Sequence, residues 1–354
     1  MGAGTVSRGG GVGTLVYIGA VSQNFVPVTY AIHVDIWHGL DNIPQSLDAS
    51  VVTIGVFDGV HRGHRRLIGT AVRRARELDV PCVLMTFEPH PVKVFAPERT
   101  PRLLGSLKDR QAMAEELGVD YFLTVDFTRS LAALSPTEYI EQVLVHQLHA
   151  RAIVVGENFT FGHKAAGTSQ TLETEGPRYG CDVDIVPLLS EDGHTISSTF
   201  IRSQLDQGHV DEAAWALGRP YSVYGEVEHG AGRGGRELGY PTANLYISLE
   251  RALPADGVYA GWFTIDPGET VDGDMEPGVR YPTAISVGMN PTFNDDRRSV
   301  ESFVLDRHAD LYGLYATVEF IGYVRGMETF SGVDELLAAM HRDVEAVRAM
   351  TARK

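Results

Sequence analysis

Cysteine is scarce in this sequence, and the few cysteines present do not form a pair. Cys82 and Cys181 are the only two among 354 residues, and each lies in an apolar, strand-like stretch. No C-x-x-C pair occurs, so a disulfide framework is excluded and a reducing compartment is favoured. We therefore expect both thiols in the hydrophobic core and the protein in the cytoplasm.

Long apolar runs and positive charge are also in short supply. No apolar run approaches the length needed to cross a bilayer, so no membrane partner is expected. Lys and Arg number 30 against 46 Asp and Glu, a formal net charge of −16, which argues against nucleic acid as a partner. On this background, an anionic ligand requires a local cluster of Arg, Lys or His.

The length of the chain favours two domains after an irregular start. Residues 1–36 are rich in Gly, Val and Ser and lack the basic region of a secretory signal, so we predict a disordered extension. The pattern of the remaining sequence changes near residue 220. We predict one domain over residues 37–219 and a second over residues 220–354.

The first domain is predicted to be α/β, with a doubly wound parallel sheet of the Rossmann type. Short β-branched runs alternate with helical spacings, which implies right-handed crossovers and helices on both faces of the sheet. Ligands of such sheets bind beyond the carboxyl ends of the strands. The expected strands span 51–57, 81–87, 121–125, 152–155 and 183–186, and the expected helices span 61–78, 107–117, 136–148 and 198–217.

The second domain is predicted to be an antiparallel β-barrel with a closing helix, and a sandwich is the alternative. Its apolar runs are separated by Gly, Pro and Asp turns, with no helix between them. The expected strands span 221–227, 242–247, 257–265, 283–287, 299–305 and 316–320, and the expected helix spans 333–350.

The stretch GVFDGVHRGH, residues 55–64, is predicted to bind the phosphates of a nucleotide. It follows an expected strand and opens an expected helix, whose free amides and dipole attract anions. His61 and His64 share one face of the first helical turn, where neutral imidazoles donate hydrogen bonds and protonation adds charge. Gly63 leaves room for a phosphate to approach. The other expected phosphate ligands of this stretch are Gly55, Phe57 and Asp58.

These histidines give the sequence a resemblance to the nucleotidyltransferases that carry H-x-G-H and release pyrophosphate. That superfamily has a second phosphate motif, which ISSTFIR, residues 196–202, resembles. On its own, this motif is equally typical of a helix cap. The resemblance implies that Arg202 acts in catalysis with the two histidines. It also implies that the helix start holds the departing phosphates through Ser197, Ser198 and Thr199.

Two further segments narrow the resemblance to one family. TFEPHP (residues 86–91) and GENFTFG (residues 156–162) each follow an expected strand. With the motifs above, they resemble the adenylyltransferase half of the prokaryotic bifunctional riboflavin kinase/FAD synthetases. The resemblance implies that Asn158 and Phe159 bind the flavin. Many relatives have Asp where Asn158 stands, and the change removes a charge while hydrogen bonding remains possible.

The second half opens with GRGGRELGYPTAN, residues 232–244. Its glycines let backbone amides wrap a phosphate. Thr242 and Asn244 face the same side of the next strand and offer oxygen ligands that suit Mg²⁺. On its own, such a stretch is more typical of a simple turn. The predicted phosphate ligands are Gly232, Gly234 and Gly239.

That stretch resembles the G-R-x-x-G-x-P-T-A-N signature of riboflavin kinases. Residues 290–293, 300–306 and 310–313 match the same family. The resemblance implies that Glu301 is the general base of the kinase and that Arg325 borders the flavin. The alternative for Glu301 is a solvated carboxylate at the rim of the barrel.

Together, the motifs imply a bifunctional transferase of flavin biosynthesis. It is expected to phosphorylate riboflavin to FMN and to adenylylate FMN to FAD, with ATP as co-substrate, Mg²⁺ as cofactor and flavin-dependent apoproteins as recipients. One alternative is a nucleotidyltransferase for another phosphorylated substrate, which does not explain the P-T-A-N barrel. The other is a non-catalytic flavin-binding protein, against which the intact His61, Arg202 and Glu301 argue.

Overall fold

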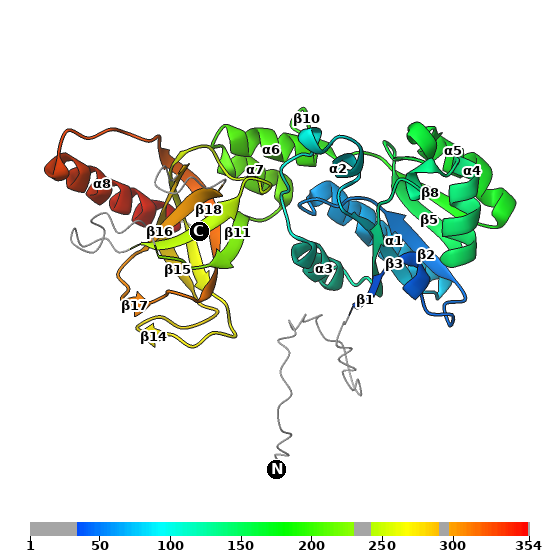
Figure 1. Cartoon of the computed structure of the whole chain (residues 1–354), viewed down its shortest axis with the longest axis horizontal. Coiled ribbons are helices and arrows are strands. Elements are labelled where there is room, and N and C mark those ends of the chain that lie inside the picture. Colours follow the sequence, from blue (N-terminus) through cyan, green and yellow to red (C-terminus); the bar gives the residue numbers. More distant parts are fainter. Residues whose placement is uncertain (1–33, 230–241, 290–296, 353–354) are drawn as a thin grey trace, which may run out of the picture.

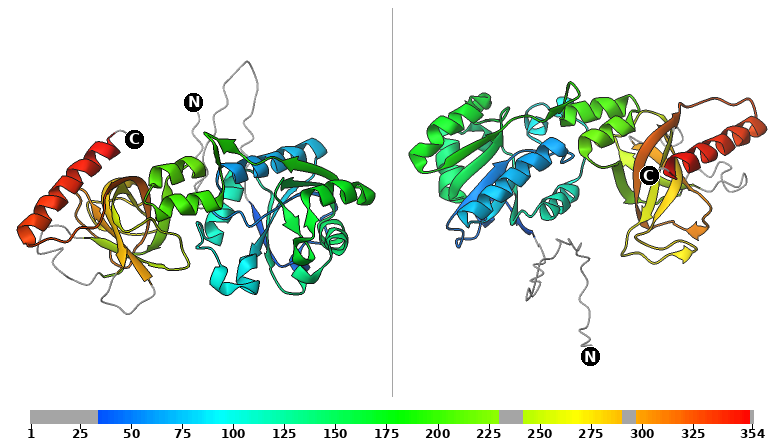
Figure 2. Two further views of the ribbon diagram at one scale, coloured as in Figure 1. Left: turned by 90° about the horizontal axis from the view of Figure 1, so that it is seen from above. Right: turned by 180° about the vertical axis from the view of Figure 1, so that it is seen from behind.

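The computed structural model describes residues 34–229, 242–289 and 297–352. Its two halves lie side by side, with a parallel sheet in the N-terminal half and an antiparallel barrel in the C-terminal half (Figure 1). Helices α6 (Ser198–Asp206) and α7 (Val210–Leu217) lie between the two sheets, as the views from above and behind also show (Figure 2). The predicted change of architecture along the chain is confirmed.

The N-terminal sheet has six parallel strands in the order β1-β4-β3-β2-β5-β8. Because β3 and β5 flank β2 on opposite sides, the strand order reverses at β2. Ligands of open α/β sheets bind in the crevice at such a reversal. The strands are β1 (Asp35–His38), β2 (Ser50–Ile54), β3 (Cys82–Glu88), β4 (Tyr121–Asp126), β5 (Ala150–Gly156) and β8 (Asp182–Val186).

Helices cover both faces of this sheet, because its strands are apolar on both sides. On one face, α1 (Arg62–Leu78) and α3 (Leu107–Glu116) share a hydrophobic cluster with Val51. On the other face, α5 (Ser169–Glu175) and the continuous helix formed by α4 (Pro136–Glu138) and the π-helix η4 (Tyr139–Gln147) pack against Val52. The prediction of a doubly wound sheet is confirmed.

Three predicted boundaries need correction. The strand expected over 51–57 ends at Ile54, because left-handed backbone at Phe57, Gly59 and Val60 turns the chain out of the sheet. The helix expected over 198–217 is two helices, which separate at Gly208, where φ is 80°. Strand β1 begins at Asp35, inside the segment 1–36 that we expected to be disordered, and residues 1–33 lie outside the described residues.

The C-terminal sheet is a nearly closed barrel in the order β11-β18-β13-β15-β16-β12. An isolated bridge between Glu228 and Asn244 closes the gap between its ends, where the amide of Glu228 donates to the carbonyl of Asn244 over 2.9 Å. The strands are β11 (Tyr221–Glu226), β12 (Ala243–Ser248), β13 (Gly257–Ile265), β15 (Arg280–Met289), β16 (Arg297–Val304) and β18 (Tyr315–Arg325).

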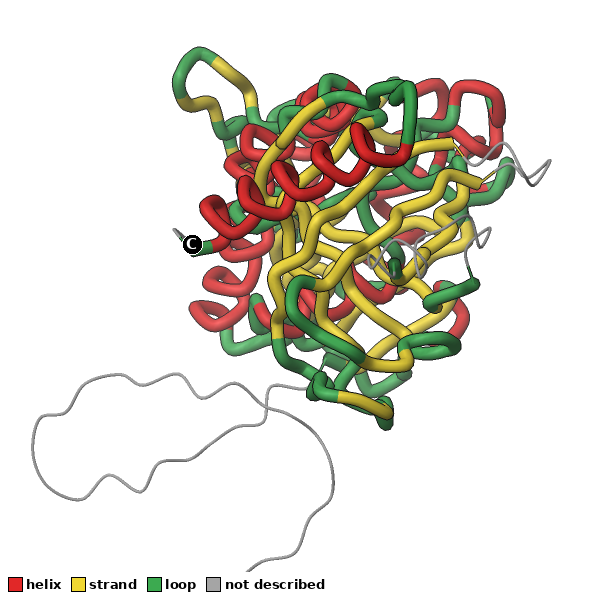
Figure 3. Tube along the Cα trace, turned by 90° about the vertical axis from the view of Figure 1, so that its left-hand side faces the viewer, coloured by secondary structure: helices red, strands yellow, loops and turns green. Residues whose placement is uncertain are grey.

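The last helix, α8 (Val333–Thr351), lies across the outside of the barrel (Figure 3). Its Val344 and Val347 join a small hydrophobic cluster with Ala260 and Ile321 of the strands. The predicted closing helix is confirmed. The remaining short elements are α2 (Pro91–Phe95), β6 (Thr160–Phe161), β7 (Gly167–Thr168), β9 (Ser190–Glu191), β10 (His194–Thr195), β14 (Asp272–Gly273) and β17 (Ala309–Asp310).

The two halves share a hydrophobic core. Ile201 of α6 and Ala213 of α7 belong to the same buried cluster as Phe320 of the barrel. The chain before α3 also reaches the barrel, where the amide of Leu103 donates to the carbonyl of Glu250 over 2.7 Å. Both cysteines are buried and unpaired, as predicted.

Gly261 of β13 is a position where the barrel should tolerate no side chain. An added Cβ would overlap the carbonyl oxygen of Glu319 and the side chain of Ile285. We expect Gly261→Ala to lower the free energy of unfolding by about 3 kcal/mol, measured by urea denaturation. The matched control is Gly288→Ala in β15, where an added Cβ meets no heavy atom within 4 Å. Equal stability of the two variants would contradict this packing.

Candidate active sites

The first candidate site is built on the turn between β2 and α1. His61 is the N-cap of α1, and its Nδ1 accepts a hydrogen bond from the backbone amide of His64 over 3.3 Å. The two imidazole rings stack, with centroids 3.6 Å apart. Because Nδ1 of His61 is an acceptor, the proton of the neutral ring is on Nε2, which remains available as a donor.

Both imidazoles are held in the neutral state. Burial, followed by the nearby Arg219 and Arg202, lowers the pKa of His61 to about 4. Burial also lowers the pKa of His64 well below its usual value, and His61 adds to the effect. The structure therefore favours two neutral hydrogen-bond donors over the added charge that the sequence also suggested.

Gly63 keeps the His61 ring in place. An added Cβ at Gly63 would lie 3.1 Å from Cε1 and 3.2 Å from Nδ1 of His61, so a side chain there would push the ring away. We expected this glycine to admit a phosphate. The imidazole of His61 uses part of this space, and the approach of a phosphate to Gly63 stays a prediction.

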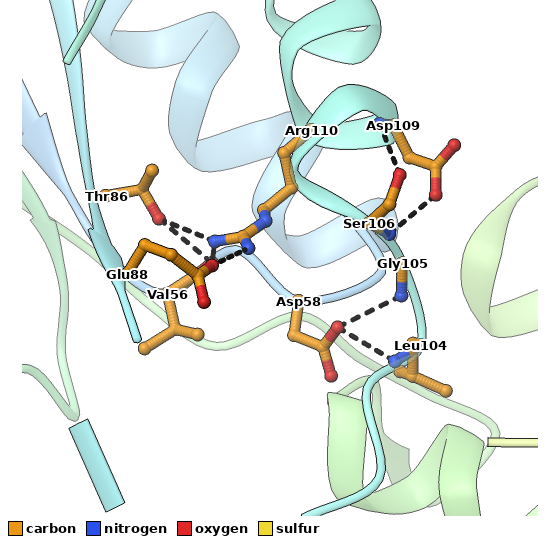
Figure 4. A network of polar contacts seen from close by, with 9 residues as sticks. All are labelled: Val56, Asp58, Thr86, Glu88, Leu104, Gly105, Ser106, Asp109 and Arg110. Carbon is orange, nitrogen blue, oxygen red and sulfur yellow. Dashed lines mark hydrogen bonds and ion pairs between the residues drawn. The ribbon is translucent and has the colours of Figure 1, made fainter. Parts of the chain in front are cut away.

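Asp58 anchors the turn rather than facing the ligand. Its Oδ1 accepts from the amides of Leu104 and Gly105 over 2.9 and 3.2 Å (Figure 4), and its Oδ2 pairs with Arg202 over 3.1 Å. Burial raises the pKa of Asp58, and Arg202 opposes this shift. Because these three contacts occupy the carboxylate, the expected role of Asp58 in binding phosphate stays a prediction.

The start of α6 lies against the same turn, as the paired motifs predicted. The hydroxyl of Ser198 donates to the carbonyl of Asp58 over 2.9 Å. Ser197 caps the helix by accepting from the amide of Phe200, whereas the side chain of Thr199 is exposed. Two segments about 140 residues apart therefore meet at Asp58, where Ser198 contacts the backbone carbonyl and Arg202 contacts the carboxylate.

A cavity of about 980 Å³ opens in front of this turn. Its volume is typical of sites for nucleotide-sized ligands. The predicted site residues that line it are Gly55, Phe57, His61, Gly63, His64, Asn158, Phe159 and Ser197. The structure thus brings the motif after β2 together with the one after β5, at the reversal of the strand order.

The cavity also has an aromatic wall that we did not predict, formed by Phe87, Phe95, Phe127, Phe159 and Phe161. The ring centroids of Phe87 and Phe127 are 5.4 Å apart, and those of Phe159 and Phe161 are 5.7 Å apart. Of these residues, the sequence interpretation singled out only Phe159. A signal was present, because Phe87 and Phe127 stand at the carboxyl ends of consecutive strands.

No aspartate or glutamate lines the described part of this cavity. Its ionisable lining includes Arg129, Lys164 and three histidines, of which His163 is the third. The guanidinium of Arg129 lies over the ring of Phe95, 5.8 Å from its centroid. On a chain of net charge −16, this lining is a local positive region that suits an anionic ligand.

Arg110 of α3 is a buried cation that the sequence interpretation missed. It ties together the ends of two neighbouring strands (Figure 4). Its guanidinium donates to the carbonyl of Val56 over 3.1 Å and to the hydroxyl of Thr86 over 3.0 Å, and it pairs with Glu88 over 3.1 Å. These contacts hold the ends of β2 and β3 together, next to the turn that carries His61.

The second candidate site lies on the outer face of the barrel. Asn244 of β12 is the cross-strand partner of Glu301 in β16, and Ser286 of β15 lies on the other side of Glu301. The side-chain nitrogen of Asn244 donates to the carbonyl of Thr242 over 3.2 Å, so this contact does not use the side-chain oxygen. The predicted Thr242, Asn244 and Glu301 therefore lie together.

The side chain of Glu301 is half-buried, and its role as the general base stays a prediction. Burial raises the pKa of Glu301, and a hydrogen bond from Ser299 opposes this shift. A carboxylate with a raised pKa is a stronger base than an exposed one.

Arg325 lies further along the same row of cross-strand partners, next to Val258. Its guanidinium is engaged by both oxygens of Asp343 in α8, over 2.8 and 2.9 Å, so its expected contact with flavin stays a prediction. The predicted Gly232, Gly234 and Gly239 lie outside the described residues.

Comparison with known families matches each half of the chain separately. Residues 43–200 match the FAD synthetase family, and residues 217–351 match the riboflavin kinase family. The bifunctional riboflavin kinase/FMN adenylyltransferase of Escherichia coli K12 is 36% identical over 307 residues, covering 86% of this chain and 93% of the relative. The protein of the same name from Bacillus subtilis is 34% identical, covering 90% and 97%.

A solved structure shares this two-part fold. The crystal structure described as a macrolide-efflux protein from Streptococcus pneumoniae has a TM-score of 0.78 and 32% identity. The match covers 89% of this chain and 99% of that one. In the described part of this chain, no helix combines the length and apolar character needed to span a membrane.

The lowered pKa of His61 makes stability depend on pH. The unfolded chain takes up a proton at this residue near pH 6.5, whereas the folded protein does so only near pH 4. Falling pH therefore favours unfolding, and His61 should cost about 2 kcal/mol of unfolding free energy between pH 7 and pH 5.

Urea denaturation at the two pH values measures this loss. We expect His61→Gln to reduce it, and His146→Gln, at an exposed position of the π-helix, to leave it unchanged. An unaltered pH dependence in His61→Gln would show that His61 is not responsible.

Proposed function

Because this chain belongs to the bifunctional riboflavin kinase/FMN adenylyltransferase family, we propose that its two candidate sites divide the two reactions of the family. The protein is a transferase of flavin biosynthesis. It phosphorylates riboflavin to FMN with ATP, and it adenylylates FMN to FAD with a second ATP and releases pyrophosphate. We propose a boundary between residues 219 and 220, which the start of β11 at Tyr221 supports.

We assign adenylyl transfer to the cavity in front of the turn that carries His61 and His64. An oxygen of the FMN phosphate forms a bond to the α-phosphorus of ATP, the bond from that phosphorus to the β-phosphate bridge breaks, and pyrophosphate leaves. The attacking group is already an anion, so neither a general base nor a covalent enzyme intermediate is required. The carboxylate-free lining supports this assignment most strongly, because two anions must approach each other there.

The neutral histidines are proposed to stabilise the transferring phosphoryl group. His61 presents its Nε2 proton, and His64 stacks beside it. Donors that are fixed before the reaction stabilise developing charge without reorganisation. Arg202 and the free amides at the start of α6 are proposed to hold the departing phosphates, and Arg202 must then exchange Asp58 for a phosphate oxygen.

The aromatic wall is the proposed site for the isoalloxazine ring of FMN. Its phenylalanines present ring faces and edges on which a flat heterocycle can stack. Asn158 lines the same cavity and can hydrogen-bond a polar edge of the ligand. The wall thereby gives the flavin an apolar pocket next to the positive region that receives its phosphate.

We assign riboflavin phosphorylation to the row of cross-strand partners on the barrel that includes Asn244 and Glu301. Glu301 is proposed to take the proton of the ribityl 5′-hydroxyl as its oxygen attacks the γ-phosphorus of ATP, and ADP leaves. The raised pKa of Glu301 and its position opposite Asn244 support this role. Unlike an FMN phosphate, a hydroxyl group needs a base.

The oxygen donors beside Glu301 fit Mg²⁺ together with ATP. The oxygens of Thr242 and of the Asn244 side chain are hard ligands, and Mg²⁺ usually completes its shell with water and phosphate oxygens. In the described part of the chain, no group of three or more His, Cys, Asp or Glu side chains could hold a metal. When bound, the ion would offset the charge that develops on the phosphates.

The cellular compartment of the protein and the recipients of its products are also proposals. The two buried, unpaired cysteines support a location in the reducing cytoplasm. The substrates implied by the family are riboflavin, FMN and ATP, and we propose flavin-dependent apoproteins as the recipients of the products.

His61→Ala tests the first assignment. With riboflavin, ATP and Mg²⁺, we expect FMN to form normally and FAD formation to fall by about 100-fold or more, because a fixed donor to the transferring group is lost. Chromatographic separation of the flavins over time measures both products. His146→Ala is the control and should leave both rates unchanged. Parallel loss of FMN and FAD formation would contradict two separate sites.

Glu301→Gln tests the second assignment. Loss of the base should lower FMN formation from riboflavin by about 100-fold or more, whereas FAD formation from supplied FMN should continue. Glu226→Gln, at an exposed position of β11, is the matched control. A normal kinase rate in Glu301→Gln would remove this residue from the mechanism.

A further inference from the structure

We propose that Arg219 is a positioning residue for adenylyl transfer, which clamps the turn that carries the catalytic histidines. This inference rests on the proposed location of that reaction at His61 and His64. It concerns a residue that belongs to none of the motifs singled out above. The observations that support it are the conformation of the turn and the contacts of the Arg219 guanidinium.

The turn between β2 and α1 is strained. Phe57 and Val60 adopt φ angles of 51° and 38°, in the left-handed region. For a β-branched residue such as Val60, this conformation is a genuine outlier. Backbone strain of this kind persists only where the surroundings enforce it.

Arg219 helps to hold the turn in this strained conformation. Its Nη2 donates to the carbonyl of Gly59 over 2.8 Å, and its Nη1 donates to the carbonyl of Val60 over 3.2 Å. These are the two carbonyls that immediately precede His61. The carboxylate of Asp58 holds the other end of the same turn through the amides of Leu104 and Gly105.

The environment of Arg219 is unusual for a cation. Among the described residues it forms no ion pair with a carboxylate, and its hydrogen bonds go to backbone carbonyls. Burial, followed by repulsion from Arg65, lowers the pKa of Arg219, although a guanidinium remains protonated. A planar fork that reaches two successive carbonyls cannot be replaced by the single ammonium group of lysine.

The position of Arg219 in the chain makes the clamp rigid. It follows Gly218, the left-handed C-cap of α7, and precedes β11, so it stands where the two halves join. An added Cβ at Gly218 would lie 3.1 Å from Cγ of Arg62 in α1, which shows how closely this connection passes the start of that helix. The clamp is therefore anchored outside the element that it restrains.

Loss of the clamp should misplace the histidines without emptying the cavity. A relaxed turn would move the Nε2 proton of His61 from the transferring phosphoryl group, and a displacement of this kind can cost about 100-fold in rate. The aromatic wall and Arg129 line the cavity in front of the turn, whereas Arg219 lines a different one, so binding of FMN should be largely retained. The row of cross-strand partners that includes Asn244 and Glu301, to which we assign riboflavin phosphorylation, contains neither the turn nor Arg219.

The test compares Arg219→Ala and Arg219→Lys with the unchanged protein, at full length. We expect kcat for adenylylation of supplied FMN to fall by about 100-fold in Arg219→Ala and by a smaller factor in Arg219→Lys. The KM for FMN and the kinase rate on riboflavin should stay within about threefold. Arg76→Ala is the matched control, because Arg76 also donates to a backbone carbonyl, that of Gly118, at the far end of α1.

Two outcomes would overturn the inference. One is normal adenylylation by Arg219→Ala. The other is an equal fall of kinase and adenylyltransferase rates in both Arg219 variants, which would indicate general destabilisation. His61→Ala, assayed in parallel, separates this inference from the proposed function: if that variant makes FAD normally, the location of the reaction is wrong, whatever Arg219 does.

Discussion

A strained turn at the end of β2 is the constraint on which the N-terminal site depends. The turn places His61 where it caps α1, and the cap in turn fixes the tautomer of the ring and its stack on His64. Left-handed backbone at Phe57 and Val60 would relax if it were unsupported. Asp58, Ser198 and Arg219 supply that support, and all three use hydrogen bonds to groups distant in sequence. The geometry of the site therefore depends on the packing of the N-terminal half around it and not on the H-x-G-H motif alone.

The two sites have opposite electrostatic requirements, because their nucleophiles differ. A phosphate nucleophile is already charged, so its site benefits from cations and neutral donors and would suffer from a carboxylate. The described lining of the N-terminal cavity meets this requirement on a strongly acidic chain. A hydroxyl nucleophile must lose a proton, and the barrel offers Glu301, a carboxylate whose pKa is raised by burial.

The sequence predicted the architecture well because its signals are local. Apolar periodicity and turn residues indicated eleven of the twelve strands in the two six-stranded sheets. They missed β1, α5 and the short elements, and they failed where single residues break an element, at Phe57 and Gly208. The motifs indicated many of the residues that gather at each candidate site. They could not indicate Arg110 or Arg219, whose partners lie 54 and 160 positions away and depend on the packed fold. The aromatic wall was missed for a related reason: its rings converge only once the order of the strands is known.

The two halves are mechanically connected even though their chemistry is separate. The carboxylate of Asp58 holds the amide of Leu104, and the preceding residue, Leu103, exchanges hydrogen bonds with Glu250 and Ala252 of the barrel. Those barrel residues closely follow β12, the strand that carries Asn244. A continuous set of contacts, made by the carboxylate of Asp58 and by backbone hydrogen bonds, thus runs from the turn that carries His61 to the residues after β12, and Arg219 forms a second connection through the covalent link. The turn that positions the histidines is therefore held in part from the barrel side, by the hydrogen bonds of Leu103 and by the link through Arg219.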